Sequence, residues 1–290
     1  MFTDRWGGKW YKVGLHIHTT LSDGLLSPEQ VSTKYKNAGF DAIAITDHWV
    51  YHAEDEICGL KIISGCEYNL GGSDTSKDVM HIVGVGMKEE PHLAPDKSSR
   101  QQVIDKIMEA GGMAILAHPA WSLNTIQDIK PLRGFSMLEI YNTVSDSHLS
   151  SRPYSGYIVD VLANHNIVYP LIATDDAHYY DGSDDTRSYI MVNAESGAQA
   201  DILKAIENKS FYATQGPQLY VKKEDGKIIA DCSDCVMIDF LSNSSITLDK
   251  AVRGDALTHA EYIIKDYEKW IRVEVHDQAG NYAWSNIIEL

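Results

Sequence analysis

The chain has 290 residues, of which 44% are hydrophobic and 23% charged, a composition typical of a globular protein and not of a disordered chain. Its 25 basic and 41 acidic residues give a formal net charge of −16, which disfavours binding to duplex nucleic acid. No apolar stretch reaches the roughly 20 residues needed to cross a bilayer, and the first residues lack the apolar core of a signal peptide. We therefore expect a cytoplasmic protein with no membrane partner.

Up to about residue 215, short apolar runs rich in Ile and Val alternate with helical patterns. Such runs are typical of buried parallel strands. They cover residues 13–18, 42–48, 61–67, 80–86, 113–118, 137–141 and 168–174. Because strands alternate with helices, the pattern indicates an α/β barrel or an α/β sheet.

The first predicted helix has clear start and stop signals. Ser27 is a good N-cap, Pro28 suits the first helical position, and Gln30 completes a capping box. Gly39 is a typical C-terminal stop, so the helix should end at residue 37 or 38. Three further helices are predicted at residues 99–110, 154–164 and 198–208.

The C-terminal part differs, because the helical period largely disappears after residue 216. Asp-Gly at 225–226 and Ala-Gly at 279–280 are hairpin signals, and residues 270–276 alternate apolar with polar side chains. We predict two domains, the first over residues 1–215 and the second, small, antiparallel and resembling a β-sandwich, over residues 217–290.

Six of the twelve histidines lie on or just after predicted strands. His16 and His18 are two residues apart, so on a strand their side chains point to the same face and can bind one metal ion together. A polar strand face is the alternative interpretation of this pair alone. Asp23 follows in a Ser-Asp-Gly sequence that is also typical of a plain turn.

Other metal-binding residue types follow the later strands, where active sites of α/β barrels gather. The glutamate among them can bridge two metal ions, which an imidazole does not normally do. Together the set exceeds the ligands that one zinc ion needs, and it suits a polynuclear site of Mn, Fe or Zn. The candidates after the first strand are Asp47, His48, Glu67, His81, His118, Asp175, Asp176 and His178.

These motifs resemble the PHP (polymerase and histidinol phosphatase) family, which includes histidinol phosphatases and nucleotide phosphoesterases. The resemblance covers about residues 11–215. This chain has Asp23 where some members have His. The matching motifs are His-x-His at 16–18, Asp23, Asp-His at 47–48, Glu67, His81, Ala-His-Pro at 117–119 and Asp-x-His at 176–178.

The resemblance implies a distorted seven-stranded (β/α) barrel that holds two or three divalent metal ions. It implies three ligand sets, of which the first two share Glu67, with Asp175 an alternative to Asp176, and Asp47 is expected to orient a ligand from outside these sets. The implied sets are His16, His18, Glu67 and Asp176; Glu67, His81 and His118; and Asp23, His48 and His178.

The expected reaction is hydrolysis of a phosphate ester of a small molecule, a nucleotide or a short oligonucleotide by a metal-activated hydroxide. The alternatives are another metal-dependent hydrolase and a non-catalytic metal-binding accessory domain. The sequence does not predict the oligomeric state. The candidate catalytic residues are His48, Asp176 and His178, and the candidate substrate-binding residues are Asn142, Arg152 and Arg187.

Overall fold

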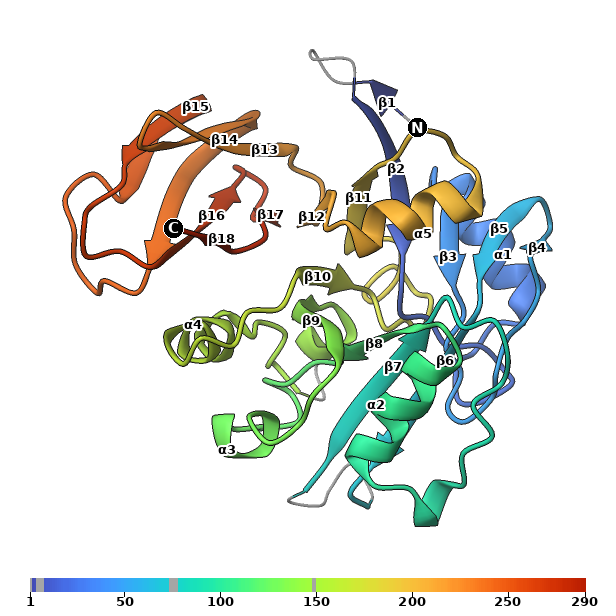
Figure 1. Cartoon of the computed structure of the whole chain (residues 1–290). Coiled ribbons are helices and arrows are strands. Elements are labelled where there is room, and N and C mark those ends of the chain that lie inside the picture. Colours follow the sequence, from blue (N-terminus) through green and yellow to red (C-terminus); the bar gives the residue numbers. More distant parts are fainter. Residues whose placement is uncertain (1, 4–7, 73–77, 148–149) are drawn as a thin grey trace.

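The computed structural model describes residues 2–3, 8–72, 78–147 and 150–290 (Figure 1). Its strands are, in chain order, β1 (Phe2–Thr3), β2 (Lys9–Gly14), β3 (Ala42–Ala44), β4 (Glu56–Ile57), β5 (Leu60–Ile63), β6 (Gly65–Leu70), β7 (Met80–Val85), β8 (Met113–Leu116), β9 (Phe135–Asn142), β10 (Leu171–Thr174), β11 (Tyr189–Asn193), β12 (Phe211–Thr214), β13 (Leu219–Glu224), β14 (Lys227–Ser242), β15 (Ala251–Ile263), β16 (Trp270–His276), β17 (Tyr282–Trp284) and β18 (Ile288–Glu289). The helices are α1 (Pro28–Asn37), α2 (Arg100–Glu109), α3 (Ile126–Ile129), α4 (Gly156–Asn164) and α5 (Gln199–Glu207), with 3₁₀ turns η1 (Pro95–Lys97) and η2 (Val144–Asp146).

The strands form two mixed sheets. One runs β13-β14-β16-β17-β12-β11-β2-β3-β5-β4, with β1, β15 and β18 added at β2, β14 and β16. The other runs β10-β9-β8-β7-β6, and α2 packs on β7 and β8 (Figure 1). The predicted α/β class and the β-rich C-terminal part are confirmed. Backbone ladders close no complete barrel within the part of the chain that the structure describes.

The capping box read from the sequence at the first helix is confirmed, and the second helix has one that the sequence analysis did not single out. At α1 the Ser27 side chain accepts from the Gln30 backbone N–H, while the Gln30 side chain accepts from Ser27. Ser99 and Gln102 make the same reciprocal pair at α2. These bonds satisfy backbone groups that the first helical turn leaves without an intrahelical partner, which is why both helices begin where predicted.

Three strand predictions are wrong. The run 13–18 lies mostly beyond β2, which ends at Gly14, so His16 and His18 follow this strand and do not stand on it. The run 61–67 is not one strand, because the chain leaves the first sheet at the end of β5 and enters the second as β6. Nor are all these strands parallel, since β7 lies antiparallel to both β6 and β8. Hydrophobic runs report burial, and they carry no information on the sheet or the direction that a strand takes.

The C-terminal strands join the first sheet through β17. This strand pairs with β12, where Ala213 lies opposite Trp284, and the Trp284 side chain is fully buried in the core of the preceding part. Residues 217–290 therefore continue a sheet that begins before them, and their assignment as a separate domain stays a prediction. None of the helices in the described ranges has both the length and the apolar character that crossing a membrane requires.

Candidate metal centre

The residues just after β2, β3 and β10 meet at one end of the two sheets. Ile17 and Ala177 form an isolated parallel bridge, and the Asp176 backbone N–H donates to His16 O at 2.9 Å. On the other side of this segment the Thr46 N–H donates to Ile17 O at 2.8 Å. These backbone bonds bring histidines and carboxylates from distant parts of the sequence to a common point.

The central group consists of His16, His18, Glu67 and Asp176, all buried. The Nε2 atoms of the two histidines lie 3.0–3.2 Å from Glu67 Oε2, and both lie 3.1 Å from Asp176 Oδ1. Despite these short distances, neither Nε2 atom nor Asp176 Oδ1 has a hydrogen-bond partner of acceptable geometry among the described residues. Four buried ligand atoms that face one point fit a divalent metal ion, with bonds of about 2.0–2.2 Å.

A second group shares the carboxylate of Glu67. Its other oxygen, Oε1, lies 3.0 Å from His81 Nδ1 and 3.4 Å from His118 Nε2, and all three side chains are buried. Each oxygen of Glu67 thus faces a different set of ring nitrogens. This is the arrangement that a carboxylate needs in order to join two ions.

A third group is more open to solvent. Asp23 lies 3.4 Å from His18 Nδ1, 3.6 Å from His48 Nε2 and 3.5 Å from His178 Nε2, measured from its nearer carboxylate oxygen. The Asp23 side chain is 53% exposed, whereas those of His48 and His178 are 19% exposed. This group contains Asp23, His48 and His178, the third ligand set implied by the family resemblance, together with His18. Its exposure allows exchange with solvent more readily than the buried central group does.

Side chains outside the three groups fix the rings. Glu139 Oε1 lies 2.7 Å from His16 Nδ1, and its Oε2 accepts the His118 backbone N–H at 2.8 Å. The Asn142 amide donates to both Glu139 and Asp176, at 2.9 and 3.1 Å. A carboxylate on the far nitrogen of a ligating histidine sets its tautomer and orientation. Asn142 is buried, and it therefore lies behind the candidate metal-binding residues.

Asp47 also lies outside the groups, as expected, and anchors the loop that carries Asp23. It accepts the Thr19 N–H at 2.7 Å, the Ser22 hydroxyl at 2.6 Å and a 2.7 Å contact from His52 Nε2. Burial raises the pKa of Asp47, but these hydrogen bonds outweigh it and bring the pKa to about 2. His52 stands in no metal-binding motif, so its contact with Asp47 is visible only in the structure.

The geometry distinguishes Asp175 from Asp176. Asp175 accepts from Tyr35 Oη at 2.8 Å and from the Ser188 N–H at 2.7 Å, and it belongs to none of the three groups. Burial raises its pKa to about 6 in spite of these hydrogen bonds. Asp176, with φ of 52°, and His118, with φ of 27°, both hold left-handed backbone conformations. Such conformations cost energy and are typical of functional sites.

Burial and charge act in opposite directions on the central group. Burial would lower the pKa of His16, but the neighbouring carboxylates Asp176, Glu67 and Glu139 raise it well above its usual value. Burial would raise the pKa of Glu67, but the surrounding histidines hold it well below its usual range. Without an ion, protons on the imidazoles compensate the carboxylates. Metal binding must displace those protons.

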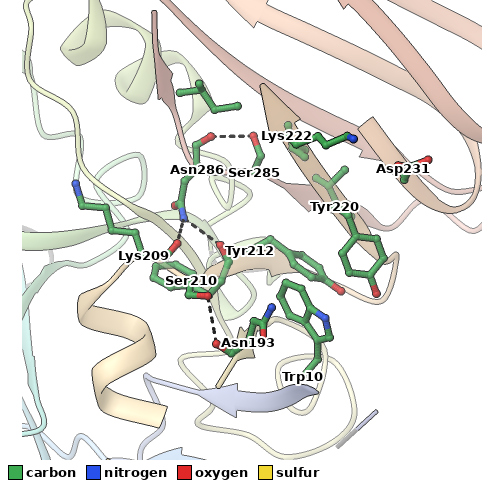
Figure 2. Close-up of a pocket in the computed structure, with 14 residues that line it drawn as sticks. Trp10, Asn193, Lys209, Ser210, Tyr212, Tyr220, Lys222, Asp231, Ser285 and Asn286 are labelled. Atoms are coloured by element: carbon green, nitrogen blue, oxygen red, sulfur yellow. Dashed lines mark hydrogen bonds between the residues drawn. The ribbon is translucent and has the colours of Figure 1, made fainter. Parts of the chain in front are cut away.

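Seven residues of the three groups line a cavity of about 660 Å³, namely Asp23, His48, Glu67, His81, His118, Asp176 and His178. Trp121, Leu123 and Tyr179 contribute to its walls, and Arg152 lines it as well. Arg187 is not among the described lining residues, and its guanidinium approaches the Ser183 carbonyl at 3.4 Å. A second cavity, of about 480 Å³, lies where β12 meets β13 and is lined by Trp10, Tyr212 and Tyr220 among others (Figure 2). None of the predicted site residues is among its described lining residues.

The fold and the buried histidine and carboxylate groups define a metal-binding α/β protein of the PHP class. The sequence model of the PHP domain matches residues 14–274. The chain belongs to the PHP domain family.

The chain is also similar to three known proteins. An uncharacterized protein of Methanocaldococcus jannaschii, MJ1587, is 31% identical over 119 residues, which cover 37% of this chain and 67% of that protein. A two-domain protein from Bacteroides vulgatus, described as containing a predicted PHP-like metal-dependent phosphoesterase, is 14% identical, with a TM-score of 0.53 over 97% of this chain and 96% of its own. This likeness shows a shared fold.

The lesion-specific endonuclease Q of Pyrococcus furiosus is 17% identical, with a TM-score of 0.48 over 69% of this chain and 56% of its own. Endonuclease Q has been solved with a 27-mer duplex substrate that carries an abasic lesion. A TM-score this low carries no argument about partners, so the exclusion of duplex nucleic acid stays a prediction.

Proposed function

We propose that this chain is a metal-dependent hydrolase that cleaves a phosphate ester of a small molecule, a nucleotide or a short oligonucleotide. The observation that carries the proposal is the pair of oxygens of Glu67, which face two different histidine groups beside one cavity. Paired metal sites of this kind are typical of phosphoester hydrolysis. The cavity also holds Arg152, and guanidinium groups match phosphate oxygens in geometry and charge.

Ions bound at these groups, which we propose to be Mn, Fe or Zn, would supply an activated water and neutralise charge on the phosphate. Glu67 and the histidines around it would hold two of them. Asp176 would help to hold an ion through Oδ1 and to orient the attacking water, while the Asn142 amide keeps the carboxylate in place through Oδ2. Arg152 would bind a phosphate oxygen from the cavity wall.

The third group offers two roles that exclude each other. His48 and His178 can help to hold a third ion with Asp23, or one of them can deliver a proton to the leaving alkoxide through the same ring nitrogen. We propose that occupancy of this group decides between the two roles. Burial and neighbouring histidines lower the pKa of His48, which favours the neutral, ligating form of that ring.

We also propose that the strands around the site form a distorted seven-stranded ring. Isolated bridges support this arrangement, since Ile17 pairs with Ala177 and His48 pairs with Glu67. They connect β2 to the end of β10, and β3 to β6, at the level of the metal-binding residues only. Away from these residues, no backbone ladder joins the two sheets in the described part of the chain.

The direct test measures phosphate release from a panel of phosphomonoesters, nucleotides and short oligonucleotides, with added Mn²⁺, Fe²⁺ or Zn²⁺ and again after chelation. Amide substrates run in parallel test the alternative hydrolase. We expect metal-dependent release that differs among the phosphate esters. Cleavage of amides alone, or no cleavage by a protein with measured metal content, would overturn the proposal in favour of the other two alternatives.

Replacement of Glu67 by Ala tests the shared carboxylate. We expect Glu67→Ala to reduce turnover by more than about 100-fold, because even supporting residues of metal sites account for about 10–100-fold. Bound metal, measured by elemental analysis, should fall while the circular dichroism spectrum is retained. Glu90→Ala, at a carboxylate 56% exposed to solvent, is the control. Wild-type turnover in Glu67→Ala would sink the assignment.

A further inference from the structure

A buried arginine on β16 connects the C-terminal strands to α4. Arg272 is 1% exposed, and its guanidinium meets Asp160 with two bonds, Nε to Oδ1 at 2.7 Å and Nη2 to Oδ2 at 3.1 Å. Its Nη1 also donates to Glu274 Oε2 at 2.9 Å. Breaking either ion pair would leave the buried charge of Arg272 uncompensated, which is costly. We therefore expect the network to hold α4 and β16 in one relative position.

Tyr154, two residues before α4 and two residues after Arg152, belongs to this network. Its hydroxyl donates to Glu274 Oε2 at 2.5 Å and accepts from Arg272 Nη2 at 3.3 Å. Its ring stacks on Trp284, with centroids 6.3 Å apart and planes at 25°. The C-terminal strands therefore hold both the hydroxyl and the ring of Tyr154.

The backbone around Tyr154 is fixed against β9, the strand that carries Glu139 and Asn142. Tyr154 forms an isolated bridge with Tyr141, the Asn142 N–H donates to Pro153 O at 3.0 Å, and the Ser155 N–H donates to Ile140 O at 2.8 Å. Residues 152–155 thus form a short strap between the C-terminal strands and the metal-binding end of the second sheet.

Arg152 begins this strap. Its backbone N–H donates to Ser145 O at 2.9 Å, and its side chain is the single Lys or Arg among the described residues that line the 660 Å³ cavity. No carboxylate pairs with its guanidinium in the described part of the chain. The other charged residues of that lining are the carboxylates and histidines of the metal groups. A phosphate group bound in this cavity would therefore have the Arg152 guanidinium as its cationic partner among the described lining side chains.

We propose that Tyr154 is a positioning residue, held by Arg272 and Glu274, that fixes Arg152 over the cavity and so sets the affinity for the phosphate group of the substrate. The inference rests on the proposed function. The C-terminal strands act on substrate binding through this strap, without contributing a residue to the described cavity lining.

The test uses the full, metal-loaded chain and inorganic phosphate as the probe, with binding measured by calorimetry. Tyr154→Phe removes the hydroxyl and keeps the stacked ring. We expect phosphate binding to weaken by about three- to tenfold, which corresponds to no more than about 1.4 kcal/mol. In an active preparation KM should rise by a similar factor with kcat within about twofold. Tyr157→Phe, at an 80% exposed tyrosine of α4, is the matched control and should change neither quantity.

A double-mutant cycle separates positioning from general destabilisation. In an Arg152→Met background, Tyr154→Phe should weaken phosphate binding no further, because the affected contact is already gone. Additive losses, or a lower melting temperature with unchanged phosphate affinity, would overturn the inference. Phosphate binding can be measured without turnover. An absence of esterase activity would therefore count against the proposed function, while the binding data would still test the role of Tyr154.

Discussion

At the scale of single residues, the candidate metal centre depends on side chains that belong to none of the three ligand groups. Glu139 contacts the ring of His16 and the backbone of His118, which belong to two different groups. A carboxylate in this position makes the imidazole more basic and prevents ring rotation. No local sequence pattern links Glu139 to His16, because the two residues are 123 positions apart in the chain.

Removing the charge of Glu139 should therefore weaken the centre without emptying it. We expect Glu139→Gln to reduce metal affinity or turnover by about 10–100-fold, the usual range for such supporting residues. Metal titration by calorimetry measures the effect, and Glu109→Gln, at a carboxylate 63% exposed on α2, serves as control. An affinity equal to wild type would mean that the contact with His16 has no effect on metal binding.

The raised pKa values of His16 and His18 predict how metal binding depends on pH. Without metal these rings carry protons at neutral pH, and an ion binds the neutral ring, so each binding event should release protons. Affinity should fall as the pH is lowered from about 8 to about 6. Calorimetry in buffers of different ionisation enthalpy counts the released protons. Affinity independent of pH, with no proton release, would contradict the assignment of these rings as ligands.

At the scale of secondary-structure elements, the break between β5 and β6 is what brings Glu67 to the centre. The chain changes sheets there, and Glu67 then lies within β6 and not at the end of the predicted strand 61–67. A Cβ at Gly65 would lie 2.5 Å from Ile45 O and 2.8 Å from Thr46 Cγ2. Glycine is required at this position because the two segments cross too closely for any side chain.

Gly65→Ala should consequently destabilise the protein by about 1–3 kcal/mol, the usual cost of forcing extra volume into a packed site. Urea denaturation measures the change in the free energy of unfolding. Gly14→Ala is the matched control, since the three atoms nearest to its Cβ would be side-chain atoms, Ile17 Cδ1 and Phe40 Cε1 at 3.3 Å and Ile43 Cγ2 at 3.6 Å, and the overlap is smaller than at Gly65. Equal stabilities of the two variants would show that the crossing at Gly65 is not tightly packed.

At the scale of the whole molecule, residues 217–290 complete a sheet and a core that begin before them. β17 covers the edge of β12, Trp284 is buried in the main core, and Arg272 neutralises Asp160. An exposed strand edge and an unpaired half-buried carboxylate both favour association or unfolding. The C-terminal strands are thus expected to stabilise the part that carries the metal groups.

A fragment ending at Gly216 tests this dependence. We expect it to aggregate or to unfold without cooperativity, because β12 loses its neighbour and the core loses Trp284. Gel filtration and thermal unfolding, with the full chain as control, measure the difference. A monomeric fragment that unfolds cooperatively would instead support an independent domain over residues 1–215.

The sequence by itself determined which residues could carry the chemistry and where the helices begin. Ligand-type side chains stand in motifs of fixed spacing, and capping pairs such as Ser27 and Gln30 act within one helical turn, so both are visible in local sequence. The apolar runs also gave the α/β class, since burial is recorded in composition.

Only the tertiary structure decided how those residues are grouped and what supports them. Tertiary contacts show that the two oxygens of Glu67 face different histidines and that Asp175 and Asp176 have different partners. They also bring Glu139 to His16 and His52 to Asp47. The same holds for the joining of β12 to β17 and the strap at Tyr154. Local periodicity cannot encode them, because sheet order and strand direction are set by packing across the whole chain.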